Sequence, residues 1–193
     1  IVGSPPQEIQ RVLLSRIDFS ATDVPSMVYS AAYLSRFNAE EQALKLYQQA
    51  AKLQPDRPEP YIMGLRLAEK LKDAEAIQWA ATGILTHVWV SDHQKWHEKA
   101  LNALAELEQS FKTSGRNAEA GRVHSVRQQA LKRDLKLELT WNGDGDLDLI
   151  VEEPNGTVCS FEAPLTAGGG VLLNDGYGPK QENCHEEYVC AYG

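Results

Sequence analysis

The sequence predicts an α+β protein in which a domain of helical hairpins, residues 1–133, is followed by a small β-sandwich, residues 134–193. Helical periodicity runs through the first part, and apolar residues alternate with polar ones from Asp134 onward. Nine of the 14 glycines and all three cysteines lie in the second part, and the net charge changes from +2 to −10. These observations place a domain boundary near Asp134.

The apolar pattern predicts seven helices, separated by short polar or proline-bearing turns, over residues 6–16, 25–36, 39–53, 58–71, 73–86, 92–113 and 116–133. In the third of these, Ala43, Tyr47 and Ala50 recur at the steps that put them on one face of a helix. Asn38 is predicted to cap this helix, and Pro58 opens the next one. The short turns favour a chain of helical hairpins.

Small and aromatic residues recur in the first part at a fixed spacing. Residues 24–57 contain Ala43, Tyr47, Ala50 and Pro55, and the small positions return as Ala76, Ala80 and Gly83. This pattern resembles the tetratricopeptide repeat, a helix-turn-helix unit of about 34 residues. The resemblance implies an α-α superhelix with a groove that binds protein segments.

We expect five residues of this domain to contact a partner: Arg36, Tyr61, Arg66, Trp89 and Trp96. The alternative is that the hairpins only hold the second domain in place. His93 and His97 are four residues apart on one expected helix, a spacing that suits a metal, but the sequence supplies no third ligand.

The second part contains five runs with strand character, which begin at Leu135, Leu147, Thr157, Val171 and Glu187. Pro154-Asn-Gly156 predicts a hairpin turn, because Asn-Gly favours positive backbone angles. Short strands with glycine and proline turns are typical of a β-sandwich or a small open barrel.

This part resembles the YfaP-type domain of unknown function from bacterial surface and envelope proteins. The resemblance rests on Asp146-Leu-Asp-Leu-Ile-Val151, Glu153-Pro-Asn-Gly156, Gly169-Gly170 and Asp175-Gly-Tyr-Gly-Pro179. It implies a sandwich with a further strand, so we expect five strands to leave an edge that other sequence or a partner completes.

Four oxygen-bearing side chains stand at every second position of the stretch that enters this domain: Asn142, Asp144, Asp146 and Asp148. Closely spaced carboxylates suit Ca²⁺, and Asp175 is a candidate further ligand. Leu147 occupies the glycine position of an EF-hand loop, so a loop site of another type is expected. The alternative is an acidic, solvated segment that discourages edge pairing.

The three cysteines lack the paired spacing of a zinc site. We predict a disulfide between Cys159 and Cys190, both in strand-like sequence, with Cys184 left as a thiol. This pairing favours an oxidising compartment. We therefore expect a periplasmic, cell-surface or extracellular location, although Ile1 opens the chain without a leader and so indicates a processed chain or a fragment.

The sequence also narrows the class of function. An acidic module without a basic stripe disfavours nucleic acid, and no run approaches the roughly 20 apolar residues that span a bilayer. No nucleophile has a recognisable base, so we expect no enzyme activity. The favoured function is a non-enzymatic scaffold of the bacterial envelope or cell surface, which binds proteins through a helical groove and a β-edge. The alternative is a Ca²⁺-dependent carbohydrate- or surface-binding module, and self-association stays open.

Overall fold

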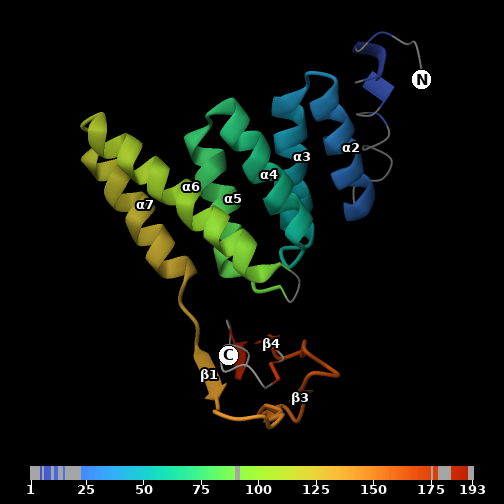
Figure 1. Cartoon of the computed structure of the whole chain (residues 1–193). Coiled ribbons are helices and arrows are strands. Elements are labelled where there is room, and N and C mark those ends of the chain that lie inside the picture. Colours follow the sequence, from blue (N-terminus) through green and yellow to red (C-terminus); the bar gives the residue numbers. More distant parts are fainter. Residues whose placement is uncertain are drawn as a thin grey trace. The chain divides into compact units, whose positions relative to one another are not determined.

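The computed structural model describes residues 5, 7–9, 11–12, 15, 23–89, 92–174, 176–177 and 184–190. It confirms the mixed α+β class, with helices first and strands afterwards (Figure 1). The chain forms two compact units. Residues 1–85 and 97–127 make the helical unit, and residues 86–96 and 128–193 make the unit that contains the strands.

The helices are α2 (Val24–Arg36), α3 (Glu40–Leu53), α4 (Pro58–Leu71), α5 (Ala74–Thr86), α6 (His93–Thr113) and α7 (Asn117–Ala130). Their ends lie within three residues of the predicted ends. Of the first predicted helix, residues 6–16, the structure describes 7–9, 11–12 and 15, and all of these are helical. Pro58 opens α4, as predicted, because a first-turn proline gives up no intrahelical hydrogen bond.

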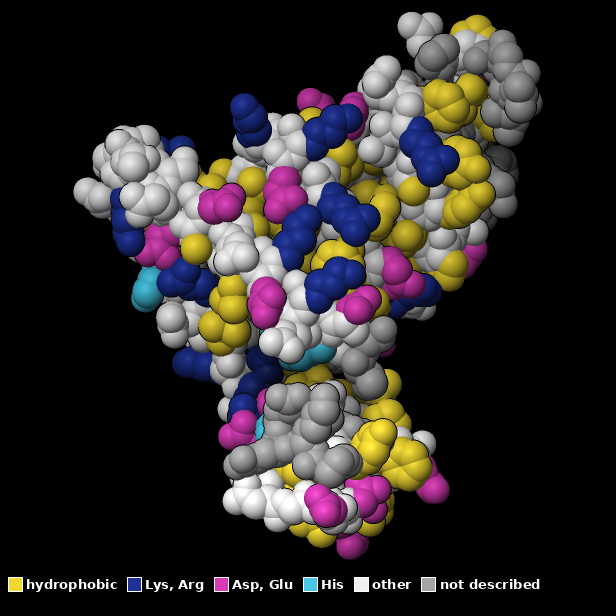
Figure 2. All heavy atoms as spheres, viewed as in Figure 1, with side chains coloured by type: hydrophobic (Ala, Val, Ile, Leu, Met, Phe, Trp, Pro, Cys, Tyr) yellow, Lys and Arg dark blue, Asp and Glu magenta, His cyan; other side chains and the backbone are white. Residues whose placement is uncertain are grey.

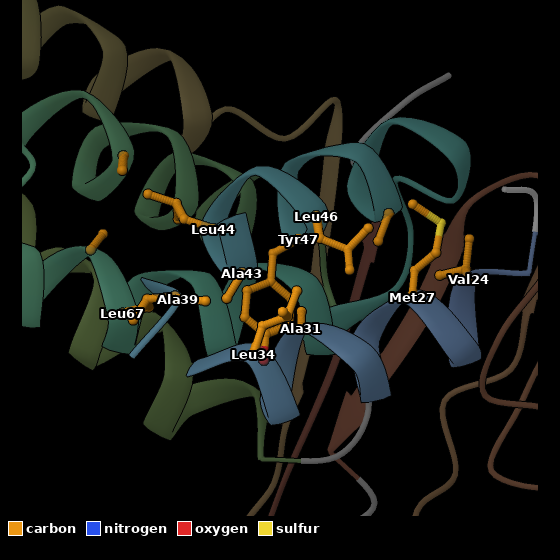
Figure 3. Packing of buried hydrophobic residues seen from close by; sticks show 13 residues of the cluster. Val24, Met27, Ala31, Leu34, Ala39, Ala43, Leu44, Leu46, Tyr47 and Leu67 are labelled. Carbon is orange, nitrogen blue, oxygen red and sulfur yellow. The ribbon is translucent and has the colours of Figure 1, made fainter. Parts of the chain in front are cut away.

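The core of the helical unit joins α2, α3 and α4. In Figure 3 the Tyr47 ring of α3 lies among Ala31, Leu34 and Ala43. Tyr47 is 1% exposed, and its burial raises its pKa to about 12. Ala31 on the facing helix α2 and Ala43 one turn earlier on α3 leave the space that this aromatic ring fills.

The turn between α2 and α3 differs from the prediction. Asn38 is not the cap of α3, because Ala39 takes that position and no side chain caps the helix. Asn38 instead has a φ of 59°, and the Ala39 N–H donates to the Leu34 carbonyl at 3.0 Å. Asparagine tolerates this left-handed conformation, so the residue ends α2 rather than starting α3.

Two glycines allow α4 and α5 to approach closely. A Cβ added to Gly83 would overlap the Tyr61 ring, and one added to Gly64 would lie 2.6 Å from the Trp79 ring. The Tyr61 and Trp79 rings are themselves 5.5 Å apart. Each aromatic ring therefore packs directly on the backbone of the opposite helix, and glycine is required at both contacts.

We predict that Gly83→Ala lowers the free energy of unfolding by ~1–3 kcal/mol, because the added methyl group displaces Tyr61. Gly121→Ala is the matched control: Gly121 lies in α7, where an added Cβ meets no atom within 4 Å. This control gains helix propensity and becomes more stable by up to ~1 kcal/mol. Urea denaturation measures both changes. An equal gain for the two variants would contradict the packing described here.

The strands are β1 (Leu135–Thr140), β2 (Val151–Glu152), β3 (Val158–Cys159), β4 (Gly170–Asn174) and β5 (His185–Cys190). They form a three-stranded sheet of order β1-β5-β4 and a two-stranded sheet of β2 and β3, and every pairing is antiparallel. Cys159, Leu172 and Tyr188 form a small core that draws on both sheets. In the predicted Asn-Gly turn, Gly156 has a φ of 82°, whereas Asn155 is not among the described residues with a positive φ.

The strand predicted from Leu147 is much shorter in the structure, where pairing starts at Val151. The Leu149 N–H donates to the side chain of Glu186, a residue of β5 that is 1% exposed. A backbone N–H that donates to a carboxylate cannot also donate to a neighbouring strand. The buried side chain of Glu186 therefore keeps Leu149 out of β2, although the local sequence pattern favours a strand there.

Candidate functional site

An open groove of about 950 Å³ lies between α5 and α7 in the helical unit. Trp79, Gln78 and Glu75 line it from α5, and Phe111 contributes from α6. The remaining side is formed by Arg116, Ala118, Glu119, Gly121, Arg122, Ser125 and Val126. The volume falls within the usual range of ligand-binding clefts.

The groove combines an apolar interior with charged side chains of both signs. Arg116 lies 4.3 Å from the Phe111 ring centre and pairs with Glu119 at 3.1 Å. Arg122 is exposed on α7. The hydrogen bond from the Glu119 backbone lowers the pKa of Glu119, as does Arg116, and the charge of Arg122 adds to this effect. The groove therefore presents aromatic surface together with a cation that is open to a bound acidic group.

A network around Glu108 joins α6 to α7 beside this groove. Glu108 is 8% exposed and contacts Lys112 at 2.6 Å, Arg127 at 3.3 Å and His124 at 3.5 Å. The hydrogen bond from Lys112 lowers the pKa of Glu108, and Arg127 and His124 add to this effect. The carboxylate holds basic groups from two helices, so it fixes the spacing of the α6–α7 hairpin.

The predicted contact residues on α2 and α4 lie elsewhere than in this groove. Tyr61 is 7% exposed and belongs to the α4–α5 contact. Arg36 is exposed at the end of α2, 5.7 Å from the Tyr33 ring centre. Arg66 is exposed on α4, with Nη1 4.0 Å from the Met63 sulfur. Apart from Phe111 and Arg116, the groove residues lie on α5 and α7, the second helices of their hairpins, whereas these three residues belong to the first helices α2 and α4.

The two predicted tryptophan contacts lie in residues 86–96 of the other unit. Trp89 stacks on His87 with ring centres 6.0 Å apart, and Lys95 lies 5.0 Å from the Trp96 ring centre. Both indoles are partly exposed. His93 and His97 do not belong to a group of three metal-ligating side chains within the described residues.

The acidic stretch before β2 is a loop with exposed side chains at Asn142, Asp144, Asp146 and Asp148. Within the described residues, no three carboxylates of this loop converge, and Asp175 lies outside them. Trp141 Nε1 donates to the Gly145 carbonyl at 2.8 Å and so fastens the loop to the end of β1. Ca²⁺ binding here stays a prediction, and it would require the loop to close around the ion.

The cysteines lie in or beside the sheets of the second unit. Cys159 is fully buried, with its sulfur 3.5 Å from the Pro164 carbonyl, and burial raises the pKa of its thiol. Cys190 packs against the same small core, with its sulfur 3.9 Å from the Gly168 carbonyl. The Cys159–Cys190 bond is not formed in this structure, so the oxidised pairing stays a prediction.

Glu153 organises the turn that precedes β4. Its side chain accepts hydrogen bonds from Thr166 at 2.5 Å, Thr157 at 2.7 Å and Tyr188 at 2.9 Å. The Thr166 bond, followed by that from Thr157, lowers the pKa of Glu153. A Cβ at Gly170 would overlap the carboxylate, as would one at Gly168. The glycine-rich run therefore wraps a buried carboxylate of its own chain.

We predict that Glu153→Gln lowers the melting temperature of the strand unit at pH 7, because a neutral amide accepts fewer bonds from the three hydroxyls. The pKa of Glu153 is lowered in the folded protein, so its contribution is present above the unfolded value of about 4.3 and is lost as pH falls through the folded value. The difference between wild type and variant should therefore shrink below pH 4.

Glu152→Gln is the control for this prediction, because the neighbouring Glu152 side chain is exposed. It should leave the melting temperature nearly unchanged at every pH. Circular dichroism melts between pH 3 and pH 8 measure both variants. A Glu153→Gln deficit that persists unchanged at pH 3 would show that the effect does not come from the ionised carboxylate.

Comparison with known proteins yields no family model, no curated protein and no solved structure that matches this chain. Among the described helices, none is both long and apolar enough to cross a bilayer.

Proposed function

We propose that this protein is a non-enzymatic interaction protein that binds a segment of another protein in the groove between α5 and α7. The observation that carries the proposal is the groove itself, which is built from the last two hairpins of the helical unit. Arrays of helical hairpins use such surfaces to hold extended or helical segments. This assignment places the binding surface on α5 and α7 instead of on Arg36, Tyr61 and Arg66.

The groove residues define the chemistry of the segment. Trp79 and Val126 offer apolar surface, which an aliphatic or aromatic side chain would cover. Arg122 offers a guanidinium group for a carboxylate, while Glu119 already pairs with Arg116. The partner segment should therefore carry an apolar anchor next to an acidic residue.

The strand unit offers a second binding surface. β1 pairs only with β5 among the described strands, so no described strand covers its other edge, which suits strand addition from a second chain. Several apolar side chains around β2 and β3 are also exposed, namely Ile150, Val158, Phe161 and Leu165. On the face in Figure 2, acidic and hydrophobic side chains lie over the strands, whereas Lys and Arg lie mainly over the helices.

The resemblance to YfaP-type domains supports a role in an assembly at the bacterial envelope or cell surface. Two distinct surfaces on one chain suit a scaffold that joins two components. A Ca²⁺-dependent surface-binding module is the weaker proposal, because the acidic loop does not bring three carboxylates together within the described residues.

Selection of peptides from a random library on the full chain tests the groove. We expect the selected peptides to share an apolar anchor beside an acidic residue, and Arg122→Glu to weaken their binding by about tenfold or more. Arg66→Glu is the matched control, because Arg66 is an exposed arginine on α4 outside the groove. Fluorescence anisotropy of a labelled peptide measures both affinities.

Equal loss in the two variants would reduce the interaction to general charge attraction and would contradict the proposed groove. Loss for Arg66→Glu alone would move the binding surface to α4, which carries two of the five contact residues predicted from the sequence, Tyr61 and Arg66.

The open edge of β1 predicts a difference in hydrogen exchange between two paired strands. Backbone amides of β5 have strands on both sides and should exchange more slowly than the average for β1. Exchange measured by NMR on the full chain checks this ordering. Full protection of all β1 amides would mean that another segment covers the edge, and the proposed strand addition would fail.

A further inference from the structure

The outer face of the three-stranded sheet gathers two carboxylates and an imidazole. Glu138 of β1 stands directly opposite Glu187 of β5, and His185 lies two residues before Glu187 on the same strand. Alternate residues of a strand share a face, so these three side chains project from one side of the sheet. Glu186 and Tyr188, which alternate with these residues along β5, are buried on the other side.

The ligand atoms of Glu138, His185 and Glu187 all lie within 4.8 Å of one another. His185 Nε2 is 3.7 Å from Glu138 Oε1 and 3.9 Å from Glu187 Oε2. Zinc bonds to nitrogen and oxygen of about 2.0–2.2 Å in a tetrahedral shell place neighbouring ligand atoms about 3.4 Å apart. The two distances from the imidazole exceed this spacing by a few tenths of an ångström, and the two carboxylates lie within 4.8 Å of each other, so small side-chain movements bring the three groups to coordination distance.

Asn174 of β4 orients the imidazole. Its side-chain amide lies 2.8 Å from His185 Nδ1. The atom at this distance is the amide Nδ2, which donates to Nδ1 and so leaves the imidazole proton on Nε2. Metal binding through Nε2 therefore requires the amide to turn over, so that its oxygen accepts an Nδ1 proton and the Nε2 lone pair faces the carboxylates. The three strands of the sheet thus each contribute one part of the arrangement.

Lys136 is the cation that balances these carboxylates in the structure. Its Nζ lies 3.0 Å from Glu138 Oε1 and 3.3 Å from Glu187 Oε1. Its side chain is 47% exposed, so it can swing into solvent at little cost when another cation takes its place. A divalent ion offers the carboxylates twice the charge of the ammonium group. It also accepts the imidazole nitrogen as a ligand, which an ammonium group cannot do.

We propose that Glu138, His185 and Glu187 bind a divalent transition-metal ion of the zinc type, which replaces the Lys136 ammonium group. An imidazole ligand favours Zn²⁺ over Ca²⁺ and Mg²⁺, which prefer oxygen ligands alone. Three protein ligands leave a fourth position for water or for a donor atom of another molecule. This site is separate from the groove between α5 and α7, and it does not depend on the function proposed for that groove.

Isothermal titration of the full chain with Zn²⁺ tests the site. We expect one ion per chain, and a fall of about tenfold or more in the association constant for either His185→Ala or Glu138→Gln. Lys136→Ala should raise the constant by about fivefold, because it removes one competing exposed ion pair. His185→Asn provides a second variant that keeps a polar group beside Asn174.

Two controls separate this site from other ligands. His124→Ala removes an exposed histidine of α7 and should leave Zn²⁺ binding unchanged. A parallel Ca²⁺ titration should show no dependence on His185. Zn²⁺ binding that is absent, or that is the same in the His185 and Glu138 variants as in wild type, would overturn the proposal, as would weaker binding in Lys136→Ala.

Discussion

The helical unit depends on close contact between aromatic rings and residues with little or no side chain. Tyr47 lies against Ala31 and Ala43, and Tyr61 lies against the backbone of Gly83. Such contacts let helices approach closely enough for each ring to fill the space between them. The position of α5, and therefore one wall of the groove, follows from the Tyr61–Gly83 contact.

The strand unit is organised differently, because two buried carboxylates take a large part in it. Glu186 accepts the Leu149 N–H, and Glu153 accepts three hydroxyl hydrogen bonds. With a small apolar core, polar contacts of this kind specify which loops lie over which strands. They also direct the remaining charges of β1 and β5 to the outer face, where Lys136 balances them.

The helices could be predicted closely because their signals are local: apolar stripes, prolines and polar turns lie within the segments that they define. The start of β2 could not, since it depends on Glu186, 37 residues from Leu149. The groove was also missed. Phe111 and Arg116 lie in the predicted helices 92–113 and 116–133, but no local pattern shows that they line a groove with Trp79. The cluster of Glu138, His185 and Glu187 needs the register of β1 with β5, which the sequence does not supply.

The contact between Tyr61 and Gly83 has a consequence for divergence of this protein. A side chain at residue 83 is destabilising while Tyr61 is retained, since it occupies space that the ring already fills. Homologous chains should therefore vary the two positions together, with a smaller residue at 61 wherever 83 is no longer glycine. The pair would be inherited as a single unit, although 22 residues separate its members in the chain.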